Sequence, residues 1–134
     1  MRRAAGCAAI LTLTTAALGA HHAIGSIYDS SRQVTLEGVV SGFRFVPPHP
    51  FVDIDVTSRD GRSERWRLEL DNHFELVTAG MSADTLRPGD KVSVTGSGAR
   101  NQDRAVYVRS LARPGDGFLY EQVGSSPRVR MRKP

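Results

Sequence analysis

The chain has 134 residues, with 18 Lys and Arg against 14 Asp and Glu and a formal net charge of +4, which is the size of one small domain. Between residues 21 and 122, however, 12 basic side chains face 14 acidic ones, so the excess positive charge lies at the two ends of the sequence. Nucleic-acid binding requires a clustered basic face, and this distribution therefore argues against a nucleic-acid partner.

Residues 1–20 have the composition of a secretory signal peptide. Two arginines follow Met1, residues 4–18 are apolar, and the small residues Gly19 and Ala20 close the segment. The apolar run is shorter than the roughly 20 residues that a membrane-spanning helix needs, so we expect no membrane span in the mature chain. The single cysteine also lies in this segment. These features predict cleavage near residue 20 and a periplasmic or secreted protein.

The segment that follows the N-terminal region reads as short β-strands. Residues 34–45 form the first, and its apolar phase changes next to Gly38, with Val39 on the inner face, which predicts a β-bulge. Residues 51–56 and 63–70 alternate between apolar and polar side chains, as half-buried strands do.

One short helix is expected after Asn72, which suits an N-cap and has Glu75 three positions later. Two further strands are predicted at residues 91–96 and 105–111. The order of three strands, a helix and two strands predicts an all-β domain with one short helix, in the form of a small five-stranded antiparallel barrel of the OB type. Another small antiparallel barrel or meander is the alternative.

The domain organisation follows from these elements. We expect a signal peptide at 1–20, an N-terminal extended segment at 21–33, the OB-like β-barrel at 34–112 and a loose basic C-terminal tail at 113–134. Four of the last seven residues are basic, a composition typical of solvated chain ends.

Four stretches of the sequence resemble a family of small secreted bacterial proteins of unknown function. They are "AHHAIGSIYD", "VTLEGVVSGFRFVPPHPFVDIDV", "WRLEL" and "LRPGDKVSVTG", and together they extend over roughly residues 20–112. Members of that family typically begin their mature part with Ala-His-His and carry a Trp-x-Asn-Pro-His segment. The resemblance implies an OB-like barrel but lends no activity.

Carried over position by position, the residues that match the family pattern are His21, His22, Tyr28, Asp29, His49, Trp66 and Glu69. The chain departs from the pattern in three places. Phe45 stands where the family prefers Trp, Pro47 stands where it prefers Asn, and an aromatic residue shortly after the His pair is missing.

The pair His21-His22 stands at the predicted cleavage site. If the peptidase cuts after Ala20, the new α-amino group and the imidazole of His21 can chelate one metal ion together. If it cuts after Gly19, a histidine in the third position can complete a square-planar nitrogen site. Both geometries suit copper, which leads the affinity order for nitrogen ligands. The alternative is that the pair is simply a polar, flexible start of the mature chain.

His49 is the candidate for a third metal ligand, because it lies in a proline-rich loop next to the expected binding face of the barrel. On this hypothesis Glu69 or Asp53 orients the imidazole or completes the ligand shell. His73, at the start of the helix, is expected at the surface. The favoured function is a periplasmic metal-binding protein, with copper as the cofactor and buffering, delivery or sensing as the role.

An alternative function uses the outward face of the second and third strands. By parity, Phe51 and Asp53 share a face with Arg65 and Arg67, which predicts either a cross-strand ion-pair network or a surface that binds a peptide, glycan or small molecule in the cell envelope without metal. No Ser/His/Asp or Cys/His nucleophile set has a motif context, so the sequence favours a binding protein over an enzyme. A copper oxidase or oxygenase is a third, weaker hypothesis.

Overall fold

The computed structural model describes residues 24–131, and the leader with the His21-His22 pair lies outside the described residues. A helical turn at 24–27 comes first, where the sequence predicted an extended segment. The elements after it are β1 (Tyr28–Arg44), β2 (Phe51–Thr57), β3 (Ser63–Glu69), α2 (His73–Thr78), β4 (Lys91–Ala99), β5 (Ala105–Arg113), β6 (Phe118–Val123) and β7 (Ser126–Arg130). The fold is therefore all-β, as predicted, but the described residues contain seven strands and two short helices where five strands and one helix were expected.

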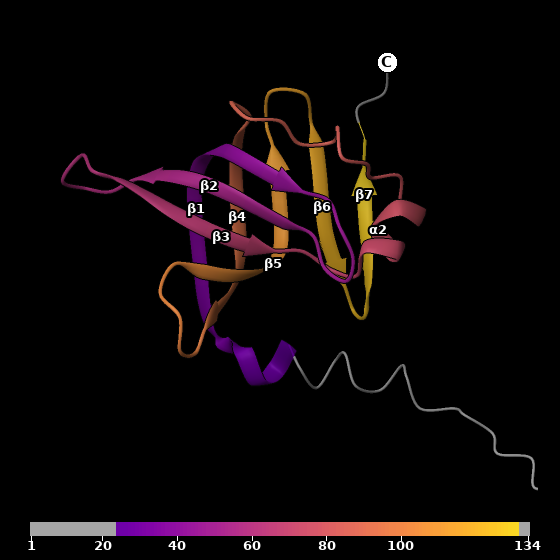
Figure 1. Cartoon of the computed structure of the whole chain (residues 1–134), viewed down its shortest axis with the longest axis horizontal. Helices are drawn as coiled ribbons and strands as arrows, with labels where there is room; N and C mark the ends of the chain where they lie inside the picture. Colours follow the sequence, from indigo (N-terminus) through magenta and orange to yellow (C-terminus); the bar gives the residue numbers. More distant parts are fainter. Residues whose placement is uncertain (1–23, 132–134) are drawn as a thin grey trace, which may run out of the picture.

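The described strands form one sheet in the order β3-β2-β1-β4-β5-β6-β7 (Figure 1). A parallel pairing between β3 and β5, over Arg67–Glu69 and Ala105–Tyr107, links strands that are otherwise at different places in the sheet. The pairings of β1, β2, β3, β5 and β4 consequently run in a closed ring. Within residues 24–131, no helix has the length and hydropathy to cross a bilayer.

The hairpin of β2 and β3 has the register that its sequence pattern predicts. Val52 pairs with Leu68 and Ile54 pairs with Trp66, and Val52, Ile54 and Leu68 are fully buried. The turn contains Gly61 at φ +80°, a conformation that glycine adopts without steric cost. Period-two alternation thus places one face of the hairpin in the core.

Strand β1 changes partner and phase along its length. It pairs first with β4 and, from Val39 onward, with β2. The prediction that Val39 faces inward is wrong, because Val40 is buried and Val39 is exposed. The phase changes at the register shift between Val40 and Gly42, and not at Gly38. Gly38 instead permits a close approach, since a Cβ there would lie 2.9 Å from the Asp55 carbonyl oxygen.

The prediction of a loose tail at 113–134 is wrong for the residues of β6 and β7, which continue the sheet beyond β5. Phe118 and Tyr120 of β6 are each 1% exposed and belong to the main core. Their large side chains are buried because alternate residues of β6 point to the same side as the core residues of β5. Residues 118–130 are therefore part of the folded domain.

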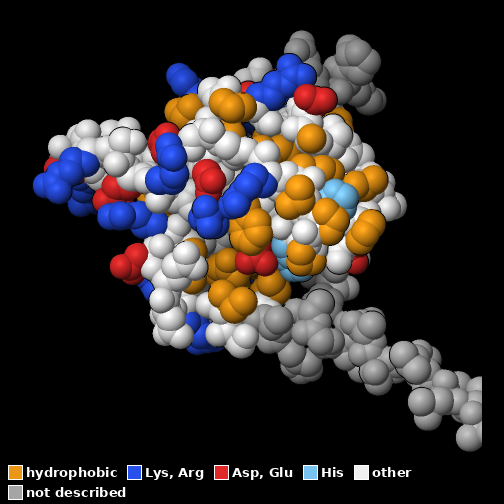
Figure 2. All heavy atoms as spheres, viewed as in Figure 1, with side chains coloured by type: hydrophobic (Ala, Val, Ile, Leu, Met, Phe, Trp, Pro, Cys, Tyr) orange, Lys and Arg blue, Asp and Glu red, His pale blue; other side chains and the backbone are white. Residues whose placement is uncertain are grey.

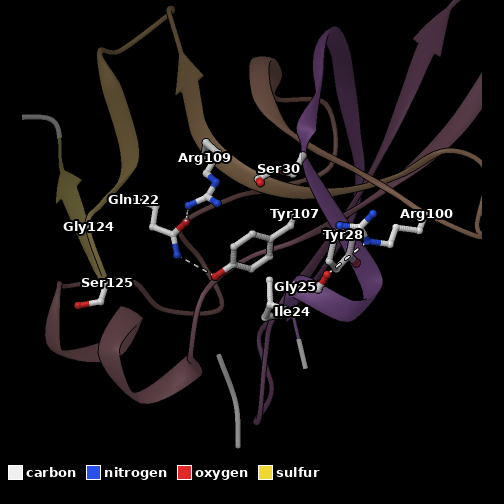
Figure 3. A pocket seen from close by; sticks show the side chains of 11 residues that line it. Ile24, Gly25, Tyr28, Ser30, Arg100, Tyr107, Arg109, Gln122, Gly124 and Ser125 are labelled. Carbon is white, nitrogen blue, oxygen red and sulfur yellow. Dashed lines mark hydrogen bonds between the residues drawn. The ribbon is translucent and has the colours of Figure 1, made fainter. Parts of the chain in front are cut away.

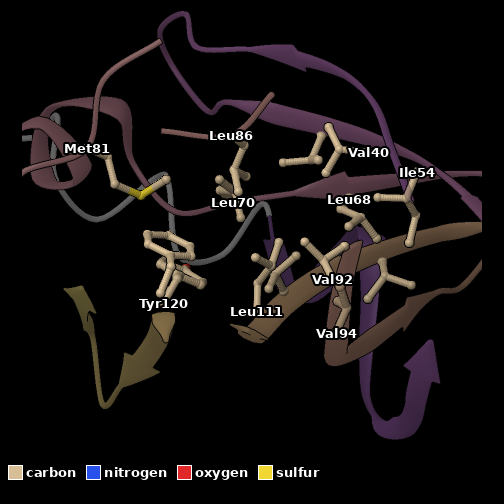
Figure 4. Packing of buried hydrophobic residues seen from close by; sticks show 14 of the residues in the cluster. Val40, Ile54, Leu68, Leu70, Met81, Leu86, Val92, Val94, Leu111 and Tyr120 are labelled. Carbon is tan, nitrogen blue, oxygen red and sulfur yellow. The ribbon is translucent and has the colours of Figure 1, made fainter. Parts of the chain in front are cut away.

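The main core lies among the strands (Figure 4), and Leu76 of α2 and Met81 after it join the cluster at one end. Asn72 caps α2 as predicted, since its side-chain oxygen accepts a hydrogen bond from the Phe74 backbone nitrogen at 2.9 Å. Leu76 of α2 is fully buried, as is Leu70 just before it. The short helix thus closes one end of the core next to the loop that carries His49.

Candidate functional site

The loop between β1 and β2 is held in place at two points on either side of His49. The Pro48 carbonyl oxygen accepts a hydrogen bond from the His73 backbone nitrogen at 2.9 Å, and the Pro50 carbonyl accepts one from the Leu70 nitrogen at 2.9 Å. These bonds join the loop to the start of α2 and to the segment after β3. His49 is therefore presented from a fixed backbone.

His49, Glu69 and Tyr28 form a continuous polar constellation. The His49 Nδ1 lies 3.1 Å from Oε1 of Glu69, and both side chains are mostly buried, at 14% and 13% exposed. The Tyr28 hydroxyl donates a hydrogen bond of 2.6 Å to the other carboxylate oxygen of Glu69. Glu69 at the end of β3 thus joins the start of β1 to the loop before β2.

Burial and hydrogen bonding set the protonation of this constellation. Burial, reinforced by the Glu69 carboxylate, raises the pKa of the Tyr28 phenol, which keeps the hydroxyl protonated as a donor. The hydrogen bond to Glu69 raises the pKa of His49 against the opposing effect of burial, and the charges of Glu69 and Asp71 add to the rise. The carboxylate therefore lies against the Nδ1 side of the imidazole, and Nε2 lies on the opposite side of the ring.

The other predicted residues on this face pair with one another. Arg67 Nε lies 3.1 Å from Asp53 Oδ1, and Arg65 Nε lies 3.0 Å from Asp55 Oδ1. These are directly opposed residues of β2 and β3, so the predicted cross-strand ion pairs form. Figure 2 shows charged side chains of both signs over this hairpin. Phe51 lies under the Arg44 guanidinium, with 5.5 Å between its ring centroid and Cζ.

The structure therefore brings together only part of the predicted site. His49 meets Glu69, whereas Asp53 faces Arg67, and His21 and His22 lie outside the described residues. Within residues 24–131, no three His, Cys, Asp or Glu side chains lie close enough together to hold a metal ion. A metal centre at His49 would thus need ligands beyond the His, Cys, Asp and Glu side chains of residues 24–131.

Most of this chain matches one protein family. Residues 9–107 match the model of a family described as "Family of unknown function (DUF6152)". The chain belongs to this family. The matched segment includes the complete Tyr28–Glu69–His49 constellation, and it ends within β5, so β6 and β7 lie beyond it. No curated protein matches the chain.

Sequence reasoning missed a second polar cluster in this member of the family. Asp71 is 5% exposed, and its carboxylate accepts hydrogen bonds from the Asn72 backbone nitrogen at 2.8 Å and from Gln122 Nε2 at 3.1 Å. Gln122 Nε2 also donates to the Tyr107 hydroxyl at 2.8 Å. Because Gln122 belongs to β6, assigning the C-terminal region to a loose tail concealed the cluster. An Asp directly after an apolar strand end was the one local signal.

His73 is also placed differently from the prediction. It was expected at the surface, but its side chain is partly buried, and its ring centroid lies 4.6 Å from that of Phe45. The contact arises because the proline-rich loop folds back onto the start of α2. His73 is therefore a packing residue in this structure, and it serves as a control histidine in the experiments below.

We predict that the contribution of His49 to stability in the metal-free protein depends on pH. Because the folded state raises the His49 pKa above its ordinary 6.5, this contribution is complete below the ordinary value and is lost as pH rises through the folded-state pKa. The His49→Gln variant should therefore lose more stability relative to the parent at about pH 5 than at about pH 9, as measured by urea unfolding. Equal losses at both pH values would contradict the prediction.

Proposed function

We propose that the protein is a secreted metal-binding protein of the cell envelope, with copper as its metal and buffering, delivery or sensing as its role. The single observation that carries the proposal is the contact between His49 Nδ1 and Glu69 Oε1 at 3.1 Å. Histidines that ligate metals almost always donate their other ring nitrogen to a carboxylate, carbonyl or water, which fixes ring orientation. The Glu69 carboxylate lies at the position of such a partner, 3.1 Å from His49 Nδ1, and Nε2 would then be the metal-binding nitrogen.

The path of the chain supports His21 and His22 as the remaining ligands. Tyr28 contacts Glu69, which contacts His49, and Ile24 packs against the small cluster that contains Tyr28. The chain thus enters the fold beside the partner of His49. Residues 21–23 extend at most about 10 Å beyond Ile24, a length commensurate with a site that includes the His49 imidazole.

The leader explains how such a site is assembled. Cleavage after Ala20 gives His21 a free α-amino group, which adds a nitrogen ligand that the precursor lacks. Nitrogen donors from amine and imidazole favour copper over the other divalent metals of the first transition row. The proposed ligand set is therefore completed by secretion, and the protein acquires its metal outside the cytoplasm.

We infer further that β1 to β5 form an OB-like barrel. The inference is supported by the closed ring of pairings, with the parallel contact of β3 and β5 as its closing step. In OB folds the loop between the first two strands borders the ligand-binding face. His49 lies in the corresponding loop here, a position consistent with a binding role.

The experiment is a competitive Cu(II) titration against a chromophoric chelator, using the chain that begins at His21. We expect His49→Ala to weaken Cu(II) binding by more than about 100-fold. Glu69→Gln should weaken it by about 10- to 100-fold, the typical cost of losing an outer partner of a ligand histidine. His73→Gln is the matched control, since it removes a partly buried histidine without touching Glu69, and it should leave the affinity unchanged.

Two outcomes would contradict the metal proposal. One is equal Cu(II) affinity in the parent and the His49→Ala variant. The other is loss of affinity in His73→Gln to the same extent as in His49→Ala, which would indicate a general response to histidine loss. The metal-free adaptor alternative, in which Phe51, Arg65 and Arg67 bind a partner, gains little support because both arginines are engaged by Asp55 and Asp53.

A further inference from the structure

A cavity of about 350 Å³ lies apart from the β2–β3 face. It is bounded by the helical turn at 24–27, the start of β1, the strands β4 and β5, and the turn between β6 and β7 (Figure 3). Its walls come from segments far apart in the sequence, including the region beyond the family match. The lining side chains that matter for its chemistry are Ile24, Tyr28, Ser97, Arg100, Tyr107 and Arg109.

Ser97 is the first sign that the cavity is built for a ligand. Its side chain is 1% exposed, it lines the cavity, and its hydroxyl has no hydrogen-bond partner within residues 24–131. A buried hydroxyl without a partner is unfavourable, so a group that accepts or donates a hydrogen bond in the cavity would satisfy it. Ser97 pairs with Tyr107 across β4 and β5, and directly opposed residues share one face of the sheet.

Arg109 supplies a positive charge that no acidic side chain of the described chain takes up directly. Its Nη1 donates to Gln122 Oε1, and its Cζ lies 5.6 Å from the centroid of the Tyr107 ring. Gln122 is itself fixed by Tyr107 and Asp71 through Nε2. The amide therefore positions the guanidinium at the cavity wall without cancelling its charge.

Arg100 contributes differently from Arg109. Its Nη1 lies 3.2 Å from Asp29 Oδ2, and its Nε donates to the Gly25 carbonyl oxygen at 3.3 Å. Its charge is thus paired, and its role is to tie the helical turn at 24–27 to the end of β4. The recognition elements of the cavity are therefore the Arg109 guanidinium, which has no acidic partner within residues 24–131, the unpartnered Ser97 hydroxyl and two tyrosine rings.

We propose that this cavity is a binding site for a small organic anion that carries an aromatic or apolar body. A carboxylate group of the ligand would accept hydrogen bonds from the planar guanidinium of Arg109 and from the Ser97 hydroxyl. The body would lie against Ile24 and the rings of Tyr28 and Tyr107, whose centroids are 5.7 Å apart. This site uses no histidine, and it shares Tyr28 with the constellation of Glu69 and His49.

The test uses benzoate as the probe and benzamide as its neutral counterpart, on metal-stripped protein that begins at His21. We expect benzoate, titrated through the millimolar range, to shift the amide resonances of β4 and β5 around Ser97 and Arg109 in nitrogen–proton correlation spectra. Benzamide has nearly the same shape without the charge and should bind at least about tenfold more weakly. Benzamide binding equal to benzoate binding would overturn the proposal, as would no shift with benzoate.

Two variants locate the site. Arg109→Gln should weaken benzoate binding at least about tenfold, whereas Arg65→Gln, which removes an arginine from the distant β2–β3 face, should leave it unchanged. Ser97→Ala removes a hydroxyl that has no partner, so it should fold normally and weaken binding severalfold. Ser97→Ala therefore carries the test if Arg109→Gln fails to fold, and full benzoate affinity in Ser97→Ala would then overturn the assignment.

Discussion

A chain that ends at Gly117 is expected to lose its cooperative folding transition. The truncation deletes β6 and β7 and with them Phe118 and Tyr120, which are among the largest fully buried side chains. Shortening one buried aromatic side chain to alanine typically costs about 3–5 kcal/mol, and a domain of this size is stable by only about 5–15 kcal/mol. Loss of both therefore consumes most or all of the stability. Thermal unfolding followed by circular dichroism measures the outcome.

The control for this truncation is a chain that ends at Met131, which keeps every strand and should unfold like the full-length protein. A cooperative transition in the chain ending at Gly117, at a midpoint close to that of the control, would contradict the prediction. It would also mean that the closed ring of β1 to β5 is stable without β6, which the burial of Tyr120 against the main core argues against.

The second large effect concerns the proposed ligands at the mature N-terminus. Placing Gly-Ser-Gly-Ser before His21 moves the α-amino group away from the histidine pair, and it leaves no histidine among the first three residues. Both copper geometries that cleavage can create are thereby removed. We expect Cu(II) affinity to fall at least about 100-fold relative to the chain that begins at His21, which corresponds to about 2.8 kcal/mol.

Competitive titration and the electron paramagnetic resonance spectrum of bound Cu(II) measure this effect. The spectrum should lose the signature of the parent site, and the residual binding should still respond to His49→Ala. A chain that begins at Ala20 separates the two geometries, because it places His22 in the third position while the α-amino group no longer belongs to His21. Unchanged affinity in the extended chain would exclude the amine as a ligand, whatever the role of His49.

Much of the fold was predictable because the alternation of apolar and polar side chains determines which face of each strand points into the core. Val52 and Ile54 specify the inner face of β2, and the turn at Gly61 sets the register with β3. The ion pair of Asp53 with Arg67 follows from that register. The contact of His49 with Glu69 follows in part as well, since Phe51 pairs with Glu69 and His49 precedes Phe51 by two positions on the same face.

The missed features have physical causes that no local pattern reveals. The sequence predicts the change of phase in β1 at Gly38, because glycine is common at β-bulges. The extra residue instead lies between Val40 and Gly42. The basic residues after Gly124 suggested a solvated end and masked the alternation of Phe118 and Tyr120. Tyr28 meets Glu69 across 41 positions, and the cavity draws on still more distant segments.

The final strand has a consequence for the behaviour of the protein among its own copies. Within the described chain β7 pairs with β6 and with no further strand, and α2 lies beside it (Figure 1). Backbone groups of β7 that α2 leaves uncovered could pair with another chain. Pro127 has no amide hydrogen to donate, and Arg128 and Arg130 are exposed. Charge and proline on an edge strand oppose intermolecular pairing. We therefore expect Arg128 and Arg130 to oppose pairing between β7 strands of separate copies.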